Sequence, residues 1–120
     1  MPQTFRLQDL TSVSTTTTQA KEDAVDIQAY KTLTLQLRKP VAGVVSAGTA
    51  TLTLQHAPTL DEDAFVDVPA AASTLDLTTT TTQVETYSNL LRYVRWSVSV
   101  STSPLTTACQ FMIDVVAREV

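Results

Sequence analysis

The stretch "NLLRYVRWSVSV", residues 89–100, carries the strongest structural signal of the sequence. Its apolar and polar side chains alternate and fall into two sets, Val94, Trp96, Val98 and Val100 against Tyr93, Arg95, Ser97 and Ser99. A period of two places successive side chains on opposite faces of a β-strand. We therefore expect a strand that buries Trp96 and its valines in a core and turns the polar set outward.

Burial in a core is enough to explain the apolar set without a ligand. Each of these side chains should contribute about 1.5–3 kcal/mol when it is fully buried. On the opposite face, an arginine beside an aromatic ring commonly packs its aliphatic stem and keeps its charged head in water. Tyr93 and Arg95 are therefore the candidates on this strand for contact with a partner or a sugar.

The same alternation recurs along the chain in short runs, at residues 25–29, 33–37, 50–54, 65–68, 75–77 and 109–117. Proline, glycine, aspartate and serine clusters separate these runs, as between antiparallel strands with one solvated face. Threonine, which suits a half-exposed pleated surface, occurs 22 times. Residues 20–24 and 84–91 could each hold a helical turn. The pattern predicts an all-β fold, an antiparallel β-sandwich of jelly-roll type.

Composition limits the class of protein. A chain of 120 residues is expected to form one domain. Its net charge is −4 and its basic residues are scattered, which argues against nucleic-acid binding. No stretch approaches the ~18 apolar residues of a membrane span, and no secretory signal is recognisable. A single cysteine excludes an internal disulfide.

The beginning of the chain has a different character. Residues 11–19, "TSVSTTTTQ", hold one aliphatic side chain and would add little to a core. We therefore expect an extended N-terminal arm over residues 1–23 and a single β-sandwich domain over residues 24–120. In the arm, the apolar residues Phe5, Leu7 and Leu10 are candidates for contact with a neighbouring molecule.

Residues with catalytic or metal-binding chemistry are few. The chain has one histidine, His56, and one cysteine, Cys109, which has the parity of core residues. Four nitrogen or sulfur ligands for zinc are not available. The acidic run Asp61, Glu62 and Asp63 lacks the glycine-spaced pattern of an EF-hand and is expected to be a charged hairpin loop rather than a calcium site. We expect no enzymatic activity, no cofactor and no metal.

The order of the segments adds a family resemblance. The segments are "DIQAYKTLTLQLR" (26–38), "GTATLTLQHAP" (48–58), "AFVDVP" (64–69), "LLRYVRWSVSV" (90–100) and "FMIDVVARE" (111–119). This order resembles that of small virion proteins of tailed bacteriophages, over residues 24–119. The resemblance implies a non-enzymatic structural protein of the virion, made in the host bacterial cytoplasm.

The resemblance implies most concretely a capsid decoration (cement) protein. Such a protein would bind the major capsid protein or other virion proteins and would self-associate, and a tail or head–tail connector component fits the same pattern. "RYVR" (92–95) also resembles the final strands of discoidin-like galactose-binding domains. That alternative implies a carbohydrate-binding module that uses Tyr93, Arg95 and the acidic run, although such domains usually run longer and carry aromatic and arginine-bearing loops that this chain lacks.

Overall fold

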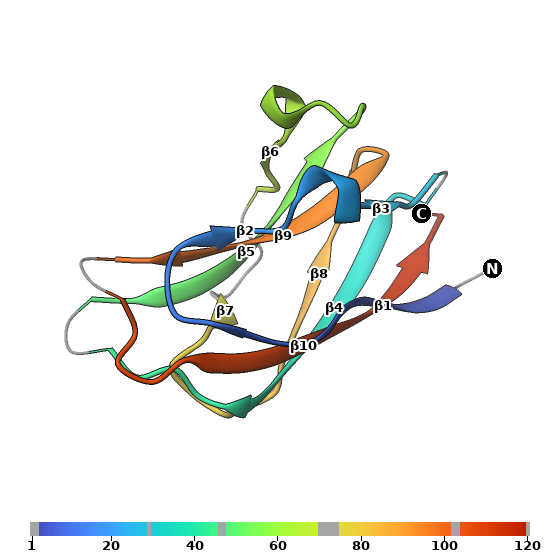
Figure 1. Ribbon diagram of the computed structural model, residues 1–120. Helices are drawn as coiled ribbons and strands as arrows, with labels where there is room; N and C mark the ends of the chain where they lie inside the picture. Colours follow the sequence, from blue (N-terminus) through green and yellow to red (C-terminus); the bar gives the residue numbers. More distant parts are fainter. Residues whose placement is uncertain (1–2, 29, 46–47, 70–74, 102–103, 120) are drawn as a thin grey trace.

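Two antiparallel sheets pack face to face in the computed structural model, which describes residues 3–28, 30–45, 48–69, 75–101 and 104–119 (Figure 1). The strands are β1 (Gln3–Val13), β2 (Thr17–Thr18), β3 (Val25–Asp26), β4 (Thr32–Val41), β5 (Ala50–Ala57), β6 (Val66–Asp67), β7 (Leu75–Asp76), β8 (Gln83–Tyr87), β9 (Tyr93–Val100) and β10 (Cys109–Arg118). Two short 3₁₀ helices, η1 (Lys21–Asp23) and η2 (Glu62–Ala64), interrupt the connections.

The order of the strands is that of a jelly roll. The first sheet runs β1-β10-β4-β8. In the second sheet β9 and β5 form the centre, β2 and β3 pair with the outer side of β9, and β6 and β7 pair with the outer side of β5. When β2 with β3, and β6 with β7, are each taken as one interrupted strand, the chain follows the jelly-roll path of two four-stranded sheets. The predicted fold class is confirmed.

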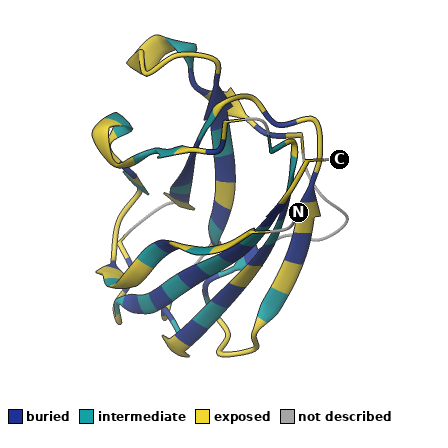
Figure 2. Cartoon of the chain, turned by 90° about the vertical axis from the view of Figure 1, so that its right-hand side faces the viewer, coloured by how far each residue is buried: buried dark blue, intermediate teal, exposed yellow. Residues whose placement is uncertain are grey.

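The core lies between the sheets and follows from the period of two. Figure 2 shows buried positions alternating with intermediate or exposed ones along the strands. Trp96 of β9 is 5% exposed, and its ring meets Phe111 of β10 edge to face at 5.3 Å between centroids. Trp96 therefore joins the two sheets, as its phase with Val94 and Val98 predicts.

Residues 3–18 belong to the sandwich, so the predicted separate arm over residues 1–23 is wrong. β1 pairs with β10 from Gln3 opposite Ala117 to Val13 opposite Cys109, and β2 pairs with β9. Leu7 and Val13 are buried in the core. The register of β1 shifts twice, and these irregularities break the alternation that would have marked residues 3–13 as a strand.

The two expected helical turns have different outcomes. Residues 21–23 do form one turn, as the 3₁₀ helix η1. The expectation of a turn within residues 84–91 is wrong, because β8 pairs with β4 and turns Glu85 and Tyr87 inward while Val84 and Thr86 stay exposed. Ala29, the last position of the alternating run expected at residues 25–29, lies outside the described residues. No helix among the described residues has the length and apolar character needed to cross a membrane.

Candidate binding sites

Arg95 is enclosed by the protein and is not available to a partner, so that expectation is wrong. Its side chain is 4% exposed, because the acidic loop (residues 59–64) folds over the guanidinium. Both Nη atoms donate to the carboxylate of Glu62, Nε donates to Gln55 Oε1 at 2.9 Å, and Nη1 donates to the Gln19 carbonyl at 3.3 Å. The guanidinium carbon also lies 4.1 Å from the centroid of the Phe65 ring.

Tyr93 keeps part of its ring open, beside a solvated ion pair. The guanidinium of Arg92 lies 5.2 Å from the Tyr93 ring centroid and makes two hydrogen bonds, of 3.1 and 2.8 Å, to the carboxylate of Asp26. These contacts hold the pKa of Asp26 below its usual value. Because Arg95 is closed off, Tyr93 and Arg95 do not form one shared site.

Of the three apolar candidates near the N-terminus, one is open. Leu7 is buried in the core, and Phe5 is half-buried against it. Leu10 is 52% exposed beside the second register shift of β1. β1 forms one edge of the first sheet and β8 forms the other, so Leu10 lies on a strand whose outer side pairs with no described strand.

The histidine and the cysteine lie in different sheets. Cys109 is fully buried in β10, and burial raises the pKa of its thiol. His56 lies in β5 of the second sheet. Over the part of the chain that the structure describes, no three histidine, cysteine or acidic side chains are grouped to hold a metal ion. In the acidic loop, Glu62 is occupied by Arg95, and Asp61 accepts a hydrogen bond from the Thr59 hydroxyl at 2.9 Å.

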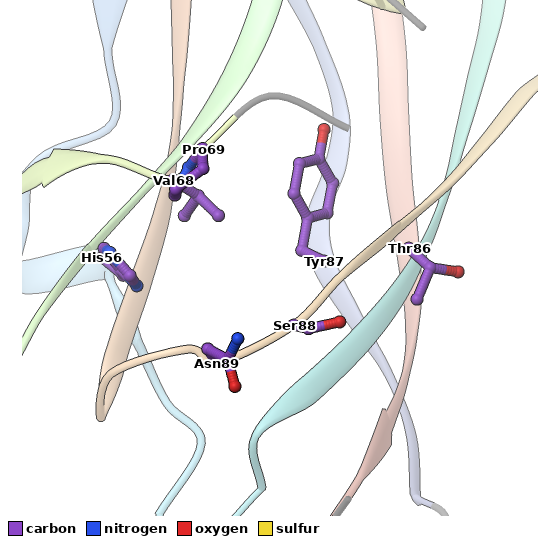
Figure 3. A pocket seen from close by; sticks show the side chains of 7 residues that line it. All are labelled: His56, Val68, Pro69, Thr86, Tyr87, Ser88 and Asn89. Atoms are coloured by element: carbon purple, nitrogen blue, oxygen red, sulfur yellow. The ribbon is translucent and has the colours of Figure 1, made fainter. Parts of the chain in front are cut away.

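A pocket that the sequence pattern did not predict opens between the two sheets. It has a volume of about 390 Å³ (Figure 3). Its lining comes from β5, from the two residues after β6, and from β8 with the turn that follows it: His56, Val68, Pro69, Thr86, Tyr87, Ser88 and Asn89. We call it the intersheet pocket.

Two buried polar side chains in this pocket are uncharged at neutral pH. His56 is 8% exposed, and its Nδ1 accepts a hydrogen bond from the Leu91 N–H at 3.2 Å, which places the ring proton on Nε2. Burial lowers the pKa of His56 from its ordinary value of 6.5. Tyr87 is 6% exposed, and burial raises the pKa of its hydroxyl to about 12.

The side of this pocket formed by β5 could have been predicted from the sequence. His56 continues the inward parity of Leu52 and Leu54, so the alternation of β5 places a histidine on the inner face. The other half depends on β8, where the helical interpretation of residues 84–91 concealed the inward position of Tyr87.

Comparisons with known proteins give little similarity. No family model matches the chain, and no curated protein matches it. One solved structure, described as "Bacillus endospore appendages form a novel family of disulfide-linked pili", is similar over 98% of this chain and 88% of that chain, with 10% sequence identity and a TM-score of 0.49.

Replacement of Arg95 by leucine should release the acidic loop while the sandwich stays folded. The Ala64 N–H, which donates to the Asp61 carbonyl, should exchange with solvent deuterium roughly tenfold faster or more. The pKa of Glu62, which the Arg95 hydrogen bonds hold low, should return toward its ordinary value. Hydrogen exchange and NMR titration measure both effects.

Arg92→Leu is the matched control for this experiment. Arg92 is 56% exposed at its side chain and contacts Asp26 rather than the acidic loop. The Arg92→Leu variant should leave the exchange rate of the Ala64 N–H unchanged. Equal exchange rates at Ala64 in the Arg95 variant and the unaltered protein would contradict a clamping role for Arg95.

Proposed function

We propose that this chain is a non-enzymatic structural protein of a tailed-phage virion, most concretely a capsid decoration protein. Two observations support the proposal: the succession of segments over residues 24–119 resembles that of such proteins, and the chain folds as a jelly-roll sandwich. The proposed binding mechanism rests on one observation: the outer edge of the 11-residue strand β1 pairs with no described strand.

The edge of β1 is suited to strand addition by a neighbour. Its outer backbone groups pair with no described strand, and such a row of N–H and C=O groups can accept a further strand. The edges of the second sheet are less suitable, because β2, β3, β6 and β7 are two residues long each. Leu10 would add an apolar contact beside the main-chain hydrogen bonds.

In this mechanism the contact is made by a folded edge rather than by a detached arm. The neighbour is the major capsid protein, another virion protein or a second copy of this chain. Contacts of modest strength become durable when many copies bind one particle, because a subunit that links several sites rebinds before it is lost. A tail or head–tail connector component would use the same edge in a smaller ring.

Quantitative mass spectrometry of gradient-purified virions tests the proposal. Copy number is scaled to the major capsid protein. A number on the order of hundreds per particle supports lattice decoration through multivalent contact. A few to a few tens would move the protein to the tail or connector, and absence from purified virions would contradict a structural role.

The same measurement tests the edge of β1. Leu10→Asp, which places a charge beside the edge, should reduce the copy number per particle. Leu60→Asp is the matched control, since Leu60 is 42% exposed in the β5–η2 connection, away from β1. An equal copy number for both variants would contradict the role of the β1 edge.

A further inference from the structure

We infer that the intersheet pocket is a binding site for a neutral, hydroxyl-rich ligand, specifically a pyranose ring of a glycan. The site does not depend on the proposed structural role. It also differs from the Tyr93–Arg95 face considered from the sequence, since its lining includes neither residue.

The first argument is that two well-buried polar side chains each leave one atom without a partner. Nε2 of His56 and the hydroxyl of Tyr87 make no hydrogen bond with any residue that the structure describes. Neither atom is completely closed off from solvent. Both atoms are therefore reached by solvent. A ligand hydroxyl that replaces the solvent at these two atoms would make their missing hydrogen bonds, so each atom offers a polar contact to a ligand.

The second argument is the arrangement of the lining. Figure 3 shows His56, Val68 and Pro69 on one side of an open centre and Tyr87 and Thr86 on the other, with Ser88 and Asn89 between them. Val68, Pro69 and the Tyr87 ring offer apolar surface. Hydroxyl and amide groups lie beside that surface. A pyranose has the same mixture, because its C–H face is apolar while its hydroxyls both donate and accept.

The third argument is the absence of charge in the lining. None of the described residues that line the pocket is acidic or basic apart from His56, and His56 is held neutral. The pocket therefore gives no ion pair to a phosphate, a carboxylate or an ammonium group. Its volume of about 390 Å³ lies in the range of small-molecule sites, about 300–1,000 Å³.

The turn that completes the pocket is fixed by Asn89. Its φ of 56° is in the left-handed region, which asparagine tolerates better than most residues. The backbone conformation holds the β8–β9 turn, and the amide side chain lines the pocket. Asn89→Gly therefore removes the amide and keeps a residue that adopts this conformation, which separates binding from folding.

The test is an NMR titration of the full ¹⁵N-labelled chain with neutral monosaccharides: galactose, glucose, mannose and N-acetylglucosamine, each to saturation or to the limit of solubility. We expect at least one sugar to shift the amide signals of Ser88, Asn89 and Leu91 together with the His56 ring signals. Sodium phosphate at matched ionic strength should leave these signals in place.

Three variants assign the site. Tyr87→Phe deletes one hydroxyl and should raise the dissociation constant for the sugar about fivefold or more, as for the loss of one hydrogen bond. Asn89→Gly should raise it by a similar factor. Tyr93→Phe deletes a hydroxyl outside the pocket and should leave the constant unchanged, and the melting temperature of each variant checks its fold.

Four results would overturn the inference. The first two are the absence of shifts with every sugar, and shifts that follow Tyr93 instead of the pocket residues. The other two are unchanged affinity in both Tyr87→Phe and Asn89→Gly, and stronger shifts with phosphate than with any sugar. Each of these results leaves the virion measurement unaffected, so the two proposals fail separately.

Discussion

Replacement of Trp96 by alanine should lower the free energy of unfolding by about 3–5 kcal/mol, the cost typical of removing a buried aromatic ring. Trp96 is 5% exposed and lies edge to face on Phe111 of the opposite sheet. Its indole N–H also donates to Gln8 Oε1 of β1 at 3.0 Å. The substitution therefore removes one packing contact between the sheets and one hydrogen bond to an edge strand. Urea unfolding at equilibrium measures the loss.

Trp96→Phe is the control that separates the ring from its N–H group. Phenylalanine retains an aromatic contact with Phe111 but cannot donate to Gln8, so the loss should be clearly smaller than in the alanine variant. A loss within about 0.5 kcal/mol for Trp96→Ala, the range typical of surface substitutions, would contradict the structural role given to this residue.

Leu7→Ala should destabilise the protein by about 2–5 kcal/mol, while Leu10→Ala should change stability by no more than about 0.5 kcal/mol. The two leucines are three positions apart on β1. Leu7 is 5% exposed in the core, whereas Leu10 is 52% exposed. Chemical unfolding of both variants gives a direct comparison, because the deleted atoms are identical and only their burial differs.

Deletion of residues 1–13 extends this test from a side chain to a strand. The truncation removes Leu7 and Val13 from the core and uncovers the whole side of β10 that pairs with β1. We expect loss of the cooperative unfolding transition together with aggregation through the uncovered strand. If β1 were a detached arm, the truncated chain would unfold at the same urea concentration as the full chain, and Leu7→Ala would behave as Leu10→Ala does.

The central strands could be predicted from the sequence because their environment is regular. β4, β9 and β10 have a neighbour on each side and turn one face to the core. The resulting period of two is visible in "TLTLQLR", residues 32–38, and in "YVRWSVSV", residues 93–100. The jelly-roll class follows from counting such runs.

The edges and the sites could not be predicted, because they depend on long-range contacts. Register shifts obscure the periodicity of β1. Arg95 has the polar parity of an outward residue, and it is buried only because the acidic loop, some 30 positions earlier, folds across it. The intersheet pocket likewise depends on the meeting of β5, β8 and the segment after β6, since no local pattern shows that His56 and Tyr87 share one cavity.

The pairing of Gln3 with Ala117 brings the two ends of the polypeptide to one corner of the molecule (Figure 1). A peptide or enzyme fused to either end would therefore emerge at the same point, beside the edge of the first sheet. A short linker would also be enough to join the ends, so that the chain could be reopened at a surface loop as a circular permutant. A fusion partner could therefore be attached at either end, or at a new end opened in a surface loop, without a change in the buried core.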